Sequence, residues 1–521
     1  MAASDVTQKK DATMAWTQRS PGDPRDKKTE EKKPLRQELS EQMDIITIGG
    51  LSHVWAAKGP VVALFWGAWS LFCLALLILN SISILSEYFS YPVSINVISK
   101  TKPFVSPPAI TVCPMARVSC RRLALGALQD AEVSKDFLLL FGASQCCFAV
   151  SKMPDFEGEL SALGCEPNGS MPESQMTFDE ALQETEGDFN KFCLDKEDIF
   201  LECSVGTSDC LSEIRGMPML DFSSKNCFTI FREETEGFNL FSSGVGEGIT
   251  LILKTDVADY PGSGLAQSSG FLVQVHHRNE QPNPMQNGVL VSPSTETRVA
   301  LRLNSIERKQ KPYPSQCILS WEETGFVPIL LHSITDFGPS SEVYIREECN
   351  AMCVHRKIIQ DCQCYLSSTR INFNVTKGAL PGPASVTANA MHVCTTKEEL
   401  KCLDDVNYNI MPDQEEDCNC RPECKYSGFT SSISTAPFPT TNYEPIFRSS
   451  YNLTESQEAT KLVVYLSSME EELQKEEPRY KDYAALLSAL GGILGLYLGL
   501  SLLILAELVL LLLNVILWCF K

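Results

Sequence analysis

The sequence predicts an α+β membrane protein in which two transmembrane helices flank one large, disulfide-rich extracellular domain. Three observations predict this fold class. Apolar residues are concentrated at 61–85 and 483–518, near the two ends of the 521-residue chain. Nineteen of the 21 cysteines lie between these stretches, which is too many for the reducing cytosol unless they bind metal. Residues 86–482 also mix alternating, strand-like patterns with helical ones.

Both apolar stretches are long enough to cross a bilayer. Residues 61–85 carry no charge, and a helix of 25 residues rises about 37 Å. Roughly 60 mostly polar residues precede this stretch, which argues against a cleaved signal peptide. The second stretch, residues 483–518, contains a single charge, Glu507. We therefore expect two spans, and the second one carries an acid.

The charge distribution predicts that both termini are cytoplasmic. Residues 1–60 hold ten Lys and Arg, and basic residues beside a span favour the cytoplasmic side. Residues 1–44 are expected to be a disordered cytoplasmic tail and 45–60 a pre-membrane segment. Residues 86–482 carry 33 basic and 55 acidic residues, a net charge of -22, which argues against a nucleic-acid partner. They also contain three glycosylation sequons, at Asn168, Asn374 and Asn452.

The extracellular part is expected to combine strands and helices. Residues 249–254, 270–275 and 297–303 alternate apolar and polar side chains, which is typical of half-buried strands. Residues 342–363 and 455–475 have helical spacing and are rich in Glu, Lys and Gln.

Ten cysteines lie between residues 317 and 424. Cys349 and Cys353 are four residues apart, so a helix would present both on one face. Zinc binding is the alternative, with His355 as a further ligand, but the sequence contains no pair of C-x-x-C knuckles. The oxidising compartment favours disulfides, and a ladder of them would form a stiff mechanical lever. We expect neither a metal site nor any other cofactor.

Several segments together resemble a known family. In chain order they are Gly49-Gly-Leu-Ser-His-Val54, Pro108-Ala-Ile-Thr-Val-Cys113, the ten cysteines from Cys317 to Cys424, and Gly491-Gly-Ile-Leu-Gly-Leu-Tyr-Leu-Gly-Leu-Ser501 followed by Glu507. Their order and spacing resemble the degenerin, epithelial sodium channel and acid-sensing ion channel family. The resemblance covers nearly all of the chain after residue 44. It implies a trimeric channel of the plasma membrane, with a β-sheet palm, a helical finger at about 114–220 and a helical thumb at about 317–424.

The resemblance also implies most of the disulfide pairing. The implied pairs are Cys113–Cys227 and Cys203–Cys210 in the palm and finger, and Cys317–Cys424, Cys349–Cys420, Cys353–Cys418, Cys362–Cys402 and Cys364–Cys394 in the thumb. Five further cysteines, at 120, 146, 147, 165 and 193, are expected to form two more finger bridges and leave one thiol over. Adjacent Cys146 and Cys147 are expected to have different partners.

The resemblance makes the second span the lining of the pore. Gly499, Leu500 and Ser501 match the family's selectivity tract, where the helix breaks and a ring of oxygens replaces the water around a cation. Ser488 stands at the position of the outer gate. Gly491, Gly495 and Gly499 are also compatible with close helix packing, and Gly492 lies beside them. Three copies of Glu507 would attract cations, although a Glu that snorkels to the interface is the alternative.

Two further regions are expected to take part in gating. Gly49, Gly50 and His53 match the family's pre-membrane His-Gly segment, with Gly49 in place of its His. Tyr91 is expected to meet Tyr313 or Pro314 at a wrist just outside the membrane, although ordinary aromatic packing would explain the same contact.

The chain lacks several acids of the acidic pocket found in proton-gated members of the family. Asn409 replaces one acid, and residues 263–267 contain no Asp or Glu. Peptide-gated, constitutive or proton-modulated opening is therefore expected.

The resemblance implies Na⁺ as the permeant ion and amiloride as a blocker, with the chain itself or sister subunits completing the trimer in the bilayer. Two other classes fit the topology. A trimeric ATP-gated cation channel needs a basic phosphate pocket, which the acidic loop disfavours. A non-conducting adhesion or ligand-binding receptor, or an accessory subunit, remains an alternative. An enzyme is not expected, because the chain has no G-x-S-x-G or H-E-x-x-H motif.

Overall fold

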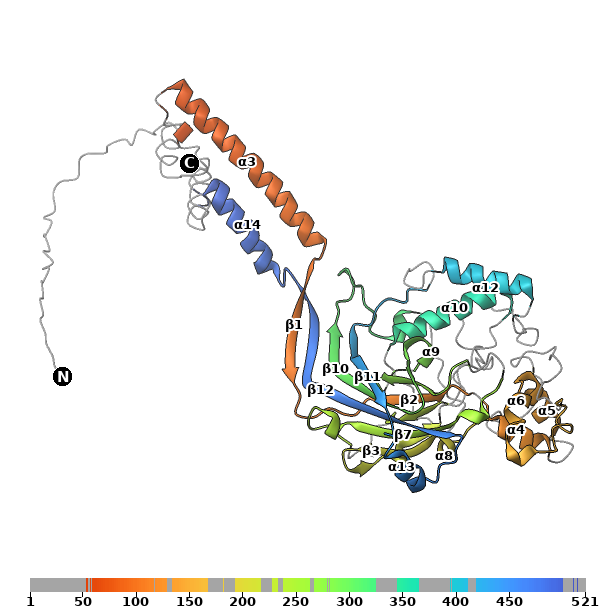
Figure 1. Ribbon diagram of the computed structural model, residues 1–521. Coiled ribbons are helices and arrows are strands. Elements are labelled where there is room, and N and C mark those ends of the chain that lie inside the picture. Colours follow the sequence, from red (N-terminus) through yellow and green to blue (C-terminus); the bar gives the residue numbers. More distant parts are fainter. Residues whose placement is uncertain are drawn as a thin grey trace, which may run out of the picture. The chain divides into compact units, whose positions relative to one another are not determined.

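The structure is a computed structural model with two compact units, residues 1–87 with 482–521 and residues 88–481 (Figure 1). Each unit is described by itself. The residues described are 53–54, 57, 59–116, 118–128, 134–166, 181, 193–216, 227–232, 238–262, 267–278, 280, 282–324, 344–364, 394, 396–410, 418–499, 509 and 513.

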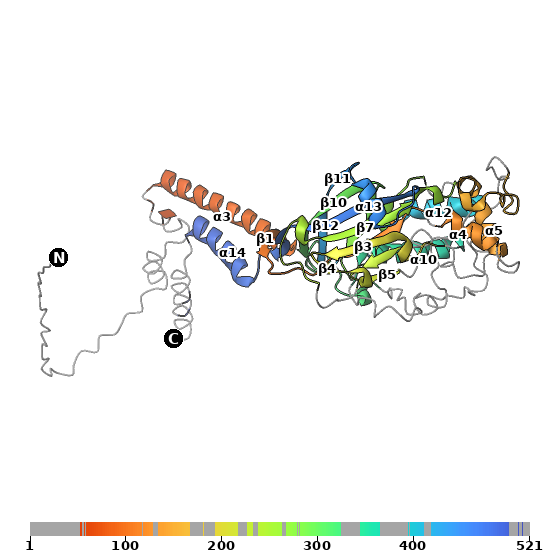
Figure 2. The ribbon, with the colours of Figure 1, turned by 60° about the horizontal axis from the view of Figure 1, so that its bottom comes forward.

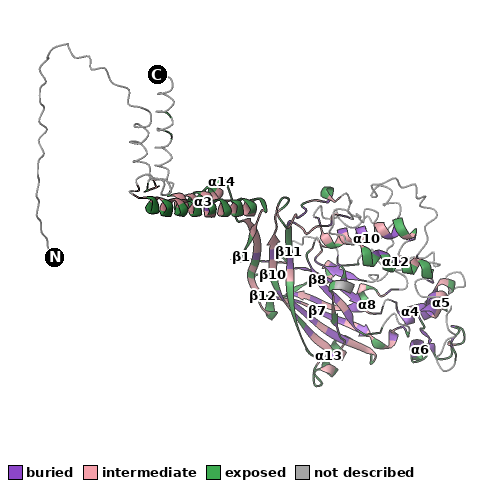
Figure 3. Ribbon diagram, turned by 90° about the horizontal axis from the view of Figure 1, so that it is seen from above, coloured by how far each residue is buried: buried purple, intermediate pink, exposed green. Residues whose placement is uncertain are grey.

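The first unit contains the helices α3 (Pro60–Phe89) and α14 (Tyr483–Leu498), although α3 runs two residues past its boundary. Figure 3 shows how little of α3 is buried, in contrast to the strands of the other unit. Only Leu77 of its 30 residues is buried, and large apolar side chains are exposed along its whole length. A helix that is apolar all round and has no protein cover is suited to lipid. It is the one helix among the described residues that is long and apolar enough to span a membrane.

The larger unit is built on two sheets that share one core. The first sheet has the order β11-β10-β12-β7-β3-β4, with β1 also paired to β12, and the second has the order β5-β6-β2-β8-β9. Figure 2 shows β10, β12, β7 and β3 side by side. The strands of the first sheet are β1 (Val93–Thr101), β3 (Phe200–Val205), β4 (Ser208–Asp209), β7 (Ile249–Asp256), β10 (Thr295–Glu307), β11 (Lys425–Pro437) and β12 (Gln457–Pro478). Those of the second are β2 (Ala109–Pro114), β5 (Ile214–Gly216), β6 (Phe228–Ile230), β8 (Phe271–His276) and β9 (Val289–Val291).

The core lies where the apolar faces of these sheets meet. Ile110 of β2 and Val273 of β8 belong to the same buried cluster as Leu251 of β7, Leu301 of β10 and Val464 of β12. All six residues of β2 are buried, as expected for a strand covered on both faces. The three strands expected at 249–254, 270–275 and 297–303 correspond to β7, β8 and β10.

One expectation from the sequence was wrong. Residues 455–475 were expected to be helical, but from Gln457 onward they belong to β12, a strand of 22 residues. The helical preference of Glu, Gln and Lys amounts to only a few tenths of a kcal/mol per residue. β12 instead hydrogen-bonds to β1, β7 and β10, and its central apolar run Leu462–Leu466 enters the shared core. These long-range pairings outweigh the local preference.

A small helical region corresponds to the expected finger. It contains α4 (Cys120–Ala127), α5 (Ser134–Ala143) and α6 (Cys147–Val150), which pack around a separate buried cluster. Disulfides Cys120–Cys146 and Cys147–Cys165 join these segments, so the adjacent cysteines do have different partners. Cys193 is buried and forms no disulfide with another cysteine that the structure describes.

The thumb region consists of α10 (Arg346–Cys362) and α12 (Lys397–Asn409), which lie side by side (Figure 1). Two cysteines of α10 form disulfides with the segment 418–420: Cys349 with Cys420, and Cys353 with Cys418. Short helices complete the unit: α8 (Lys196–Ile199), α9 (Pro284–Asn287) and α13 (Glu444–Ser450).

The structure has nine disulfides among its described residues, and all seven pairs implied by the resemblance are present. These seven are Cys113–Cys227, Cys203–Cys210, Cys317–Cys424, Cys349–Cys420, Cys353–Cys418, Cys362–Cys402 and Cys364–Cys394.

Candidate pore helix and gating junction

The helix α14 begins at a capped N-terminus and ends at a glycine. The Asp482 carboxylate accepts a hydrogen bond from the Ala485 backbone N–H at 2.9 Å. At the other end Gly499 adopts a left-handed conformation, with φ +64°, and its N–H donates to the Gly495 carbonyl at 3.0 Å. Such a glycine is a common helix C-cap, because a side chain there would be strained. The helix therefore breaks at the first residue of the expected selectivity tract.

The residues of α14 that were expected to line the pore have few neighbouring atoms. Ser488, Gly491 and Gly492 are exposed, and no atom lies within 4 Å of a Cβ built on Gly491 or Gly492. Gly495 is half-buried. Leu500, Ser501 and Glu507 lie outside the described residues.

A polar contact joins the two helices of this unit. The Asn80 amide donates to the Tyr497 hydroxyl at 3.0 Å and to the Leu76 carbonyl at 3.0 Å. An amide in the apolar part of a span needs such partners. Ahead of α3, the His53 ring stacks on the Trp66 ring, with centroids 4.5 Å apart. Gly49 and Gly50 lie outside the described residues.

In the larger unit, β1 and β12 form the strand pair that continues toward the two helices in sequence. Their register runs from Val93 opposite Pro478 to Thr101 opposite Glu470. Arg479 N–H then donates to the Pro92 carbonyl at 2.9 Å. Any movement of β12 is thus shared with β1, because nine residue pairs join them.

The loop after β10 contacts β12 and the residue Tyr91 shortly before β1. The Tyr313 ring lies edge-on to that of Tyr91, with centroids 5.7 Å apart and planes at 80°. Tyr91 itself has φ +51°, a left-handed conformation that is uncommon for a bulky residue. Pro314 lies next to Tyr313, in the same loop.

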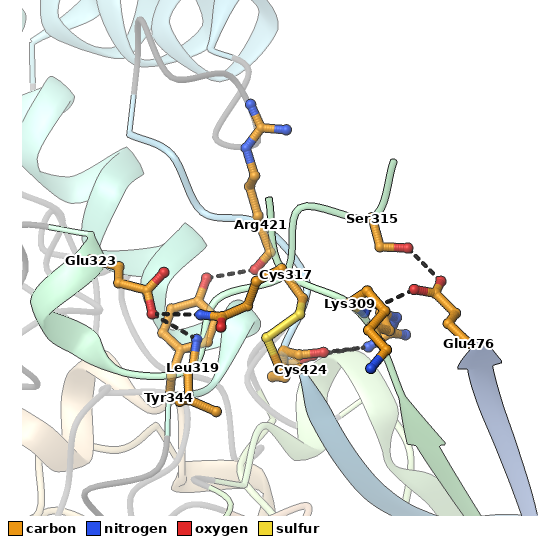
Figure 4. The surroundings of a disulfide bond; sticks show 12 residues. Lys309, Ser315, Cys317, Leu319, Glu323, Tyr344, Arg421, Cys424 and Glu476 are labelled. Carbon is orange, nitrogen blue, oxygen red and sulfur yellow. Dashed lines mark hydrogen bonds and ion pairs between the residues drawn. A yellow bond between two sulfur atoms is a disulfide. The ribbon is translucent and has the colours of Figure 1, made fainter. Parts of the chain in front are cut away.

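A second attachment of this loop uses Glu476 of β12 (Figure 4). One carboxylate oxygen accepts a hydrogen bond from the Lys309 N–H at 2.9 Å, and the other accepts one from the Ser315 hydroxyl. No local sequence pattern distinguishes Glu476, because both of its hydrogen-bond partners lie more than 160 residues away in the chain.

The base of the thumb adjoins the same loop. Cys317 and Cys424 form a disulfide, and Arg308 N–H donates to the Cys424 carbonyl at 2.8 Å (Figure 4). The Cys424 N–H in turn donates to the Ile318 carbonyl at 3.0 Å. The thumb base, the loop and the β1–β12 pair therefore form one continuous chain of bonds, which we call the gating junction (residues 91–101, 308–318, 423–424 and 470–479).

A family model supports the resemblance of the sequence. The model for the amiloride-sensitive sodium channel matches residues 43–511. The chain belongs to this family. It is 22% identical to the degenerin-like protein asic-2 of Caenorhabditis elegans, over 88% of this chain and 83% of that protein. It is 23% identical to acid-sensing ion channel 2 of Rattus norvegicus, over 89% and 83%. A solved proton-activated chloride channel aligns at 8% identity over 87% of this chain and 96% of that one, with a TM-score of 0.28, too low to indicate a common fold.

This ion-channel chain also has buried titratable groups that the sequence analysis missed. Asp259 accepts a hydrogen bond from the Arg121 N–H, at the start of the finger helix α4, at 2.6 Å. Burial raises the pKa of Asp259 to about 6. His276 bonds to Thr111, which bonds to Thr229, and burial lowers the pKa of His276 to about 4. His276 is 3% exposed, whereas its neighbour His277 is exposed.

In the thumb helix α12, Asn409 stands at a position where proton-gated members were expected to have an acid. Asn409 donates to the Asp405 carbonyl of its own helix at 2.8 Å. Residues 263–266 lie outside the description.

Of the three sequons, Asn452 is exposed in the turn before β12, and Asn168 and Asn374 are not described.

Proposed function

We propose that three copies of this chain, or of it and sister subunits, form a plasma-membrane channel that conducts mainly Na⁺ and is blocked by amiloride. The proposal rests on family membership and above all on one observation, the left-handed Gly499 at the end of α14. A broken helix frees backbone carbonyls that would otherwise bond within it. Three such breaks around an axis would supply a ring of oxygens for a cation.

The remaining pore residues have separate roles in this proposal. Leu500 and Ser501 complete the narrow tract, with Ser501 contributing hydroxyls. Glu507 places a carboxylate in an otherwise uncharged span, which is costly unless it faces water, and its charge favours cations over anions. Ser488, ten residues before the end of α14, forms the outer gate.

Gating is proposed to act through the gating junction. The thumb is stiffened by its disulfides, and its base is bonded to the loop that contacts Tyr91 and Glu476. A rotation of the thumb would therefore pull on β12, which four residues separate from α14. His53, with the neighbouring Gly49 and Gly50, is proposed to modulate opening from the cytoplasmic side.

The stimulus is proposed to be a peptide or another extracellular ligand, or the channel opens constitutively, with protons as modulators. Asn409 in place of an acid supports this view over simple proton activation, because paired carboxylates are what raise a pKa toward neutral pH.

Voltage clamp on cells that express the chain alone tests the proposal. We expect a current that amiloride blocks, that reverses near the sodium equilibrium potential, and that shrinks when K⁺ replaces bath Na⁺. A current carried by anions would refute the proposal. Surface protein without any current would favour the accessory-subunit or receptor alternatives.

A further inference from the structure

A cavity lies between the two sheets of the palm and the start of the thumb helix α10. It consists of two hollows of about 320 and 160 Å³, both lined by His277, Glu280, Glu347 and Tyr426. Glu423 and Tyr344 line the smaller hollow. The gating junction includes Glu423, but the other residues of this cavity take no part in the function proposed above.

The cavity is strongly acidic. Glu280, Glu347 and Glu423 face a single ammonium group, that of Lys425, in the smaller hollow, which gives a formal charge of -2. Arg308 lies 3.8 Å from Glu423, and the Arg346 N–H donates to Glu423 at 2.7 Å, so this carboxylate is partly compensated. Neither Glu280 nor Glu347 forms an ion pair with the residues that the structure describes. Burial, and then the charges of Glu347 and Glu423, raise the pKa of Glu280.

A buried amide independently indicates a missing hydrogen-bond donor. Gln274 of β8 lines the larger hollow and is only 3% exposed, yet its Oε1 has no hydrogen-bond partner among the residues that the structure describes. A buried acceptor is almost always paired in native proteins, so an unpaired one in a cavity calls for a ligand that donates.

We propose that this cavity binds a guanidinium group, either an arginine side chain of a peptide or a small guanidine. The carboxylates and the amide accept hydrogen bonds, and a guanidinium offers five donors in one plane. Tyr344 and Tyr426 line the smaller hollow, and aromatic rings attract a guanidinium ion. A bare metal ion fits less well, because the described residues contain no group of three His, Cys, Asp or Glu side chains placed to hold one.

Binding to the purified full-length channel in lipid nanodiscs tests this inference without any need for current, so its outcome is separate from that of the proposed function. The probe is N-acetyl-L-argininamide, measured by isothermal titration at pH 7.5. We expect saturable binding that weakens at least tenfold in the double variant Glu280→Gln, Glu347→Gln, which loses two charge-assisted contacts.

The matched control is Glu398→Gln. Glu398 is exposed in the first turn of α12, as Glu347 is in the first turn of α10, but it does not line the cavity. This control is expected to bind within twofold of the wild type. No binding by the wild type, equal binding by the double variant, or equal loss in the control would each overturn the inference.

Two further probes identify the chemistry and its source. N-acetyl-L-lysinamide carries the same charge on an ammonium, and binding as tight as that of the arginine probe would overturn the guanidinium assignment. Methylguanidine contains the head group alone. If it binds as tightly as N-acetyl-L-argininamide, a small guanidine is the ligand; if the arginine probe binds more tightly, the ligand is a peptide arginine.

Discussion

At the scale of single residues, Glu476 makes the most specific contact of the gating junction. Its two carboxylate oxygens bond to two points of one loop, Lys309 and Ser315, which holds the thumb base on the strand that precedes the pore helix. Tyr91 and Tyr313 make the other contact of that loop, but ring packing is less directional than a pair of hydrogen bonds.

Replacing Glu476 by Ala is expected to lower stability by about 1–3 kcal/mol, because two donors lose a charged acceptor. The same change is expected to weaken the response of the current to its extracellular stimulus, while the Na⁺ preference stays unchanged. Melting temperature and voltage clamp measure the two effects. Glu472→Ala is the control, since Glu472 is exposed on the same strand. Equal effects in both variants would contradict the role assigned to Glu476.

Asp259 provides a test by pH. Its pKa is raised from 3.8 to about 6, so the folded state takes up the proton at a higher pH than the unfolded state. As pH falls through 6 toward 4, protonation of Asp259 therefore raises the free energy of unfolding by up to about 3 kcal/mol. This gain is lost again as pH rises through 6.

We expect the melting temperature of the wild type to rise relative to that of Asp259→Asn as pH falls from 7 to 5. Comparing the two proteins at each pH cancels the opposite effect of His276, which is neutral in the folded state. Parallel pH profiles would show that Asp259 is not the titrating group.

At the scale of elements, the sequence predicted the strands whose buried face is evident from the local order of apolar and polar residues. The strands at 249–254, 270–275 and 297–303 were recognisable because alternation reports which face is buried. β12 was not recognisable as a strand from its sequence. Its Glu-rich half is extended because it pairs with β1 and β10, which are remote in sequence. The disulfide pairs came from the family resemblance, since spacing alone allows many pairings. Gly499 was named from the sequence, but its left-handed backbone is visible only in the structure.

The thumb-base disulfide offers a prediction at this scale. The neighbouring Cys349–Cys420 bridge already joins the two segments, so Cys317–Cys424 closes a loop of roughly 38 residues, and its loss is expected to cost about 4 kcal/mol. Cys203–Cys210 spans 7 residues and its loss is expected to cost about 2 kcal/mol. Melting of the two double Cys→Ala variants measures the difference. A larger loss for Cys203–Cys210 would contradict this account.

At the scale of the whole molecule, the proposed function gives each chain two spans, which are too few to enclose a pore, so it requires an assembly. The exposed apolar surface of α3 and the bare, glycine-bearing surface of α14 both have room for lipid or neighbouring chains. We expect native mass spectrometry of the purified channel in nanodiscs to give three chains per particle. A monomer at all concentrations would leave no route for ions.

The most direct test of the central claim is the current through a variant that needs no stimulus. Ser488→Trp places a bulky side chain at the exposed gate position of α14, where it is expected to hold the pore open. Whole-cell voltage clamp should then record a standing current that amiloride blocks and that reverses near the sodium equilibrium potential. Surface-expressed Ser488→Trp protein with no current above that of untransfected cells would contradict the claim that α14 lines a sodium pore.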